Sequence, residues 1–107
     1  MPKQSAPQEL ARIAPKPAEV TDEVLLGDIW ERPGLSPRDR SLVTVSVLAA
    51  LCRSDQLGYH LGVALDNGLS LEELSEAITH LAFYAGRPNG MTAINQLKKI
   101  ADERVGA

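Results

Sequence analysis

The chain has 107 residues, one cysteine and a formal net charge of −3 at pH 7. Its length fits one domain and excludes a second independent core. A single cysteine excludes an intrachain disulfide and is typical of a reducing compartment. The mixed charges lack the concentrated basic patch that nucleic-acid binding needs, and no segment approaches the ~20 apolar residues of a membrane helix. We therefore expect a cytoplasmic protein with neither a nucleic-acid nor a membrane partner.

The N-terminal part of the sequence gives a weak helical signal. Residues 1–20 are expected to form a flexible segment with no more than a short turn at 8–13. Thr21 is predicted to cap a helix over 22–30, because its side-chain oxygen could accept a hydrogen bond from the first helical turn. A single helical domain is then expected over 21–107.

A strong helix-start signal follows at Ser36 and Pro37, since proline at the first helical position gives up an amide that has no partner there. The helix is predicted to run over 37–53. Its interior, 42–52, is apolar on nearly every face, and a helix tolerates this only when protein surrounds it. A small domain cannot surround it alone, so we expect a homo-oligomer. Cys52 is interpreted as a small core residue rather than a nucleophile.

The next helix is predicted over 55–66, with Ser54 as its N-cap. Asn67 and Gly68 follow as a left-handed stop. Because the turn before this helix is short, we expect it to pack antiparallel to the helix that precedes it.

Two more helices complete the chain. Ser70 and Glu73 have the spacing of a capping box, which predicts a helix over 71–85 ended by Gly86. A last helix is expected over 88–103. No segment has the alternating pattern of a strand. The sequence therefore predicts an all-α fold of about five to six helices.

Two histidines are the main candidates for chemistry. His60 lies on or beside the apolar face of its predicted helix, where a hydrogen-bonded core or interface histidine is favoured over a general acid or base with a tuned pKa. His80 shares one helix face with Glu76 and Tyr84. A polar seam at an interface is favoured there over a carboxylate-oriented base. No compact ligand spacing predicts a metal site.

Three blocks of the sequence, Trp30 to Thr44, His60 to Gly68 and His80 to Met91, resemble the carboxymuconolactone decarboxylase family. The resemblance covers roughly 22–101. It implies an all-α fold related to alkylhydroperoxidase D. It also implies a ring-like homo-oligomer, often a hexamer built as a trimer of dimers.

The family contains two chemistries, and the sequence matches one of them. The peroxidase-like branch carries a Glu, a Cys-x-x-Cys pair and a His four residues after the second Cys. Aligned on His60, these positions hold Ser41, Arg53 and Gln56. Cys52 has no resolving partner within the chain, so a dithiol cycle cannot run there. The sequence therefore resembles the decarboxylase-like branch.

This branch implies removal of CO₂ from 4-carboxymuconolactone, or from a related small lactone or keto acid of aromatic catabolism, without a cofactor or metal. The enzyme would stabilise a dienolate and then deliver a proton. We expect His60 and His80 to be catalytic. The expected substrate-binding residues are Trp30, Arg40, Tyr84 and Arg87. Related sequences commonly have Trp-Pro-Asn where this chain has Arg87-Pro88-Asn89.

Two other functions stay open at the level of sequence. One is a non-enzymatic oligomeric module that binds a small organic acid. The other is a thiol-dependent antioxidant protein that uses Cys52 between chains, which the missing Cys-x-x-Cys pair disfavours.

Overall fold

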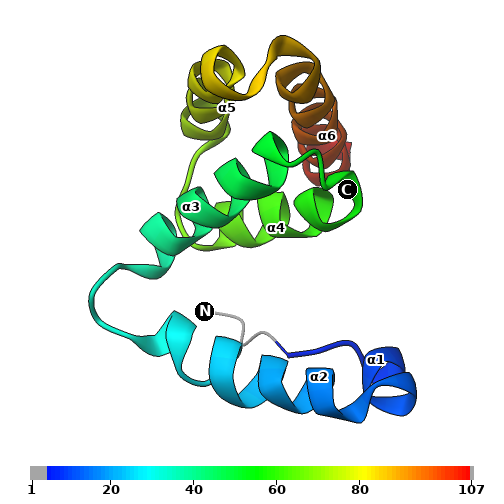
Figure 1. The fold of residues 1–107 in the computed structure, drawn as a ribbon. Coiled ribbons are helices and arrows are strands. Elements are labelled where there is room, and N and C mark those ends of the chain that lie inside the picture. Colours follow the sequence, from blue (N-terminus) through cyan, green and yellow to red (C-terminus); the bar gives the residue numbers. More distant parts are fainter. Residues whose placement is uncertain (1–4, 107) are drawn as a thin grey trace. The chain divides into compact units, whose positions relative to one another are not determined.

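The computed structural model describes residues 5–106. Over this range the ordered elements are all helical and none is a strand (Figure 1), which confirms the predicted all-α class. The chain divides into two compact units, one up to Pro37 and one from Arg38 onward. The expectation of a single domain over 21–107 is a statement about which residues fold independently of the rest, and it stays a prediction.

The N-terminal unit consists of short helical elements. They are α1 (Gln8–Ile13), α2 (Pro15–Val20), the π-helix η1 (Thr21–Leu26) and the 3₁₀ helix η2 (Ile29–Glu31). The predicted N-cap at Thr21 is wrong, because the Thr21 hydroxyl donates to the Pro17 carbonyl at 2.8 Å. This back-bond to the preceding turn is typical of threonine inside a continuous helical stretch.

Helix α3 (Pro37–Ala50) begins at the predicted proline and ends before the predicted Arg53. Cys52 has a φ of +57°, a left-handed conformation that no α-helix continues through. Its side chain is exposed, so the prediction of a buried core thiol is wrong. The apolar run nevertheless leaves an exposed stripe along α3 and the turn after it, since Val43 and Val47 on the helix and Leu51 in the turn are between 49% and 63% exposed.

Helix α4 (Ser54–Asp66) begins one residue earlier than predicted. Its N-cap is Arg53, and no side chain caps it. The Leu57 amide donates to the Arg53 carbonyl at 2.9 Å, which places Ser54 inside the first turn and corrects its predicted role. At the other end, Asn67 Nδ2 donates to Ser41 Oγ at 2.8 Å. The end of α4 thus lies beside the start of α3, and the predicted antiparallel packing is confirmed.

Helix α5 (Leu71–Ala85) has the predicted bounds and the predicted capping box. Ser70 Oγ accepts from the Glu73 amide at 3.0 Å, and the Glu73 carboxylate accepts from the Ser70 amide at 2.9 Å. Gly86, with a φ of +102°, ends the helix. These reciprocal bonds fix where α5 starts, and so which of its side chains share a face.

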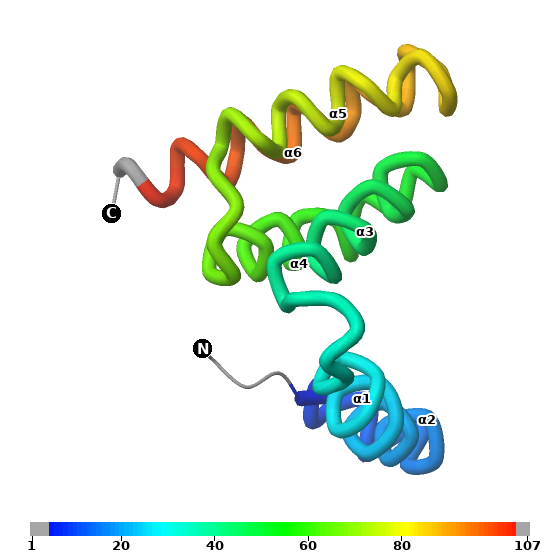
Figure 2. The backbone as a smooth tube through the Cα atoms, turned by 90° about the vertical axis from the view of Figure 1, so that its left-hand side faces the viewer, coloured from blue at the N-terminus to red at the C-terminus, as the bar shows by residue number. Residues whose placement is uncertain are grey.

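Helix α6 (Arg87–Gly106) follows directly and lies alongside α5 (Figure 2). A Cβ atom at the buried Gly90 would come within 2.7 Å of the Ala82 Cβ, so only glycine allows this approach. Asn89 Nδ2 donates to the Ala50 carbonyl at 2.8 Å and to the Ala85 carbonyl at 3.2 Å. One side chain therefore joins the ends of α3 and α5.

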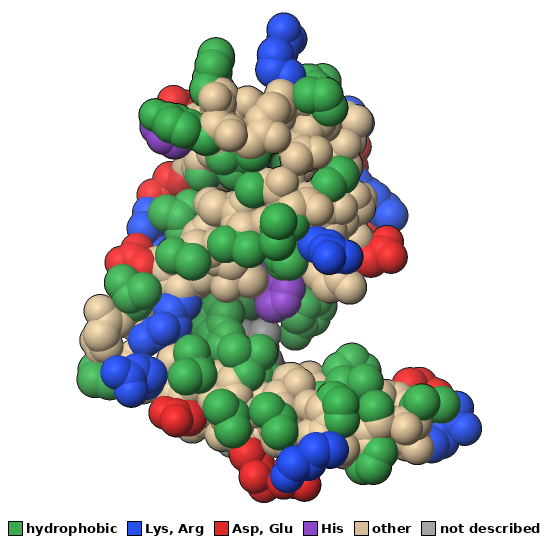
Figure 3. Space-filling view, in the orientation of Figure 1, with side chains coloured by type: hydrophobic (Ala, Val, Ile, Leu, Met, Phe, Trp, Pro, Cys, Tyr) green, Lys and Arg blue, Asp and Glu red, His purple; other side chains and the backbone are tan. Residues whose placement is uncertain are grey.

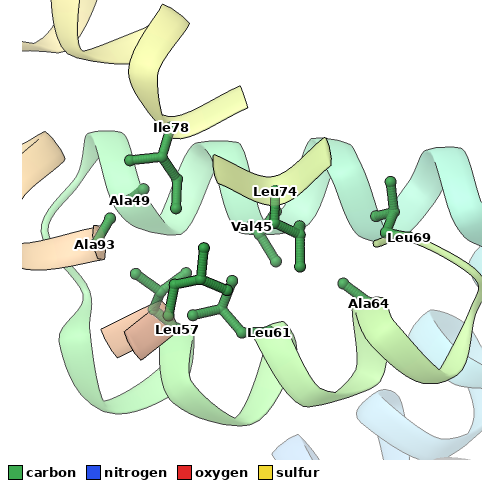
Figure 4. Packing of buried hydrophobic residues seen from close by; sticks show 10 residues of the cluster. Val45, Ala49, Leu57, Leu61, Ala64, Leu69, Leu74, Ile78 and Ala93 are labelled. Carbon is green, nitrogen blue, oxygen red and sulfur yellow. The ribbon is translucent and has the colours of Figure 1, made fainter. Parts of the chain in front are cut away.

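The core of the second unit is built from all four of its long helices. Side chains from α3 and α4 face one another and are covered by α5 and α6 (Figure 4). The largest fully buried apolar side chains are Val45, Leu57, Leu61 and Leu74. Burying one such side chain stabilises a fold by about 1.5–3 kcal/mol. This packing holds α3 and α5 in the arrangement that forms the surface groove described next.

Candidate functional site

A surface groove of about 710 Å³ lies along α3, the turn before α5, and α5 itself. Apolar side chains from each of these elements form its walls. Its polar and charged lining residues are Arg38, Ser46, Glu73, Glu76, His80 and Tyr84. The groove therefore combines apolar walls with a cation, carboxylates, an imidazole and a phenol, which is the usual composition of a small-ligand site.

The α5 side of the groove carries the predicted cluster of Glu76, His80 and Tyr84. Their i, i+4 and i+8 spacing places them on one helix face, as the sequence predicts. The His80 and Tyr84 rings lie 5.2 Å apart between centroids and are tilted by 35°. Both side chains are exposed, so they can reach a bound molecule and solvent.

The α3 side contributes Arg38, which was not among the site residues expected from the sequence. Its guanidinium donates to the Glu73 carboxylate and, at 3.3 Å, to Asp39. The hydrogen bond from the Ser70 amide, together with the charge of Arg38, holds the pKa of Glu73 below its usual value. Glu73 is therefore ionised at neutral pH, and it both caps α5 and orients Arg38 at the groove.

His60 has quite different surroundings. It is half-buried on α4, and its ring meets the Tyr59 ring edge-on at 5.0 Å between centroids. Its Nδ1 atom is buried and has no hydrogen-bond partner among the residues that the structure describes. Burial lowers the pKa of His60, which favours the neutral imidazole.

The two histidines do not share this groove, because His60 is absent from its lining. The two histidine side chains, purple in Figure 3, also lie at separate places on the surface. The described residues therefore include two separate histidine sites, and the one at His80 lies in this groove with other polar groups.

The other predicted substrate-binding residues lie elsewhere. Arg40 is half-buried in α3, and its carbonyl accepts a hydrogen bond from Thr44 Oγ1 at 2.8 Å. Arg87 lines a smaller cavity between α5 and α6. Trp30 is half-buried in η2, which belongs to the N-terminal unit. Tyr84 is the member of the predicted set that the groove includes.

No three side chains among His, Cys, Asp and Glu within the part of the chain that the structure describes come together in a way that could hold a metal ion. None of its helices is both long and apolar enough to cross a membrane.

Comparison with known proteins finds curated relatives that match most of the chain. The chain is 43% identical over 74 residues to a 4-carboxymuconolactone decarboxylase of Acinetobacter baylyi, which covers 69% of this chain and 55% of the relative. It is 33% identical over 87 residues to a nitrosuccinic acid decarboxylase of Metarhizium robertsii, covering 81% of this chain and 61% of the relative. The chain thus spans little more than half the length of these relatives.

The model of the carboxymuconolactone decarboxylase family matches residues 15–99. This stretch contains α3, α4, α5 and most of α6, and with them the whole groove. The helical fold agrees with the fold that the sequence resemblance implies. The chain belongs to the carboxymuconolactone decarboxylase family.

Proposed function

We propose that this chain is a lyase that removes CO₂ from a small organic acid without a cofactor. The candidate substrates are 4-carboxymuconolactone and related lactones or keto acids. The observation that carries the proposal is the groove, which places Arg38, His80 and Tyr84 together in a chain similar to two decarboxylases. The groove's volume of about 710 Å³ is ample for a ligand of this size.

The names of the two relatives define a common chemical problem. In both, the acid also carries an electron-accepting group, a lactone in one and a nitro group in the other. When the bond between the carboxylate carbon and the neighbouring carbon breaks, CO₂ leaves. The electron pair of the broken bond moves into the electron-accepting group. A new C–H bond then forms with a proton from the enzyme. The protein must therefore stabilise the accepting oxygens and supply one proton.

His80 is the proposed proton donor. It is exposed and lines the groove, and Glu76 lies on the same face of α5. An imidazole can deliver a proton to the substrate carbon and recover one from water near neutral pH. Protonation by a positioned side chain typically contributes about 10²–10⁴-fold to a rate.

Arg38 and Tyr84 are the proposed partners of the electron-accepting group. A cation at the departing carboxylate would stabilise charge that the reaction removes, and so would slow the step. At the accepting oxygens it stabilises charge that develops in the transition state. Glu73 holds the Arg38 side chain, so little ordering is left to occur during the reaction.

We also propose that copies of this chain assemble into a homo-oligomer. The exposed stripe of Val43 and Val47 on α3, with Leu51 in the turn after it, gives such an assembly apolar surface to bury. The size of the particle in solution, measured by light scattering, tests this part of the proposal independently of activity.

The direct test of the reaction is incubation of 4-carboxymuconolactone with the purified chain. Loss of its ultraviolet absorbance should accompany release of CO₂. The chain provides a matched pair of variants in its two tyrosines. Tyr84→Phe removes a hydroxyl from the groove and should lower the rate about tenfold or more. Tyr59→Phe removes a hydroxyl beside His60 and should leave the rate nearly unchanged.

Nitrosuccinic acid serves as the second substrate in the same assay. Turnover of either acid, reduced by Tyr84→Phe and not by Tyr59→Phe, would support the proposal. A well-folded chain that turns over neither acid would refute it. Equal activity in both tyrosine variants would refute the placement of the reaction in the groove.

A further inference from the structure

A second cavity lies between α5 and α6, with a volume of about 190 Å³. Ile78, Ala82 and Ile94 line it with apolar surface, as do the exposed side chains of Phe83 and Met91. It shares no lining residue with the groove that contains His80. Phe83 is 82% exposed and Met91 is 55% exposed, which leaves a large apolar area open to water.

The shape of this cavity follows from the sequence of the two helices. Gly90 lies against Ala82, so α5 and α6 are close together at that point. The small side chains there leave space that the flanking Phe83 and Met91 do not fill. An apolar cavity of about 150 Å³ is large enough to bind benzene. The volume between α5 and α6 therefore fits a single ring or a short branched chain.

One charged residue lines the cavity. Arg87 is exposed, and its guanidinium makes no hydrogen bond or ion pair with any residue in the described range 5–106. It is also the first residue of the 20-residue helix α6, where the helix dipole adds positive potential. No carboxylate is among the lining residues. The electrostatics of the cavity therefore favour an anion.

We propose that the α5–α6 cavity binds a small organic anion that has an apolar ring or short chain. Its carboxylate pairs with Arg87, and its apolar body lies against Ile78, Ala82 and Ile94. Phe83 and Met91 lose exposed surface when the ligand binds. This site is separate from the His80 groove and does not depend on the reaction proposed there.

Benzoate is a suitable probe because it combines one ring with one carboxylate. Titration of the full chain by calorimetry should show saturable binding, and the methyl signals of Ile78, Met91 and Ile94 should shift in the NMR spectrum. Benzamide has the ring without the charge, and acetate has the charge without the ring. Each of them should bind more weakly than benzoate by about tenfold or more.

Three variants locate the site. Arg87→Gln should weaken benzoate binding about tenfold or more, because it removes a charge-assisted hydrogen bond. Lys99→Gln removes the same charge from an exposed position on the same helix and should leave the affinity unchanged. Arg38→Gln in the other groove should leave the benzoate-induced shifts of the Ile78, Met91 and Ile94 methyl signals unchanged.

The proposal would be overturned by several results. One is the absence of saturable benzoate binding to the folded chain. Another is binding that survives Arg87→Gln and is lost in Arg38→Gln, which would move the anion to the His80 groove. A third is an equal loss of benzoate affinity in Arg87→Gln and Lys99→Gln. This would show that the affinity depends on the net charge of α6 and not on Arg87 in particular. Each of these three results can be obtained whether or not the chain decarboxylates any acid.

Discussion

His80 and His60 have the same side chain in opposite surroundings. His80 is exposed on α5 and faces a groove beside Tyr84 and an oriented arginine. His60 is half-buried on α4, with one ring nitrogen unpartnered and an aromatic ring against it. The first arrangement can exchange protons with a ligand and with water. The second favours one neutral state, so residue type alone does not identify the reactive histidine.

Among the variants that test this difference between the two histidine sites, Arg38→Gln should have the largest effect on kcat. Removing the guanidinium deprives the His80 groove of its cation, and loss of one such transition-state contact typically lowers kcat by about 10²–10³-fold. Steady-state rates with 4-carboxymuconolactone measure it, and Lys99→Gln is the charge-matched control. Full activity in Arg38→Gln would show that the groove does not use this residue.

Gly90→Ala is expected to act on stability. The new Cβ would lie within 2.7 Å of the Ala82 Cβ, so α5 and α6 must separate. Overpacking of this kind typically costs about 1–3 kcal/mol. Urea denaturation followed by circular dichroism measures the free energy of unfolding. Gly34→Ala, where no atom lies within 4 Å of the new Cβ, is the matched control and should have a much smaller effect.

Ser70→Ala removes one half of the capping box at the start of α5. Loss of an N-cap hydroxyl costs about 1 kcal/mol. Because Glu73 also orients Arg38, whose proposed contact forms in the transition state, the variant should lower kcat more than it raises KM. Ser70→Thr keeps the hydroxyl and should restore both values. Unchanged kinetics in a destabilised Ser70→Ala chain would show that the capping box does not influence activity in the groove.

The smallest expected effect concerns pH and belongs to His60. Burial lowers its folded-state pKa below the ordinary value of 6.5, so the unfolded chain binds the proton more readily. The free energy of unfolding should therefore fall as the pH drops through 6.5 towards the folded-state pKa, and it should be fully retained above 6.5. His60→Gln should remove this dependence, and His80→Gln should not. The free energy of unfolding of both variants is measured from pH 5 to 8. An equal dependence on pH in His60→Gln and His80→Gln would contradict the difference drawn between the two histidines.

Local signals in the sequence were reliable where one short segment determines the structure. Pro37 starts α3, Gly68 and Gly86 follow the ends of two helices, and the Ser70–Glu73 pair forms its capping box. Each of these depends on backbone chemistry within one turn of helix. The spacing of Glu76, His80 and Tyr84 on one face of α5 could be predicted for the same reason.

The remaining features depend on tertiary geometry. Thr21 and Ser54 have cap-forming side chains, yet the hydrogen-bond ladder begins before each of them. Cys52 lies in an apolar run, and the turn that joins α3 to α4 exposes it. Arg38 meets Glu73 across a separation of 35 residues, which no local pattern reveals. The position of the groove, and therefore which polar residues it includes, follows from the packing of α3 against α5.

The most direct test of the account compares turnover of 4-carboxymuconolactone by His80→Gln and His60→Gln, with the particle size of each variant checked by gel filtration. If His80 in the groove is the proton donor, His80→Gln loses about a hundredfold or more in kcat while His60→Gln keeps most of the wild-type rate. Loss of turnover in a well-assembled His60→Gln protein, with His80→Gln active, would contradict the account and place the chemistry on α4.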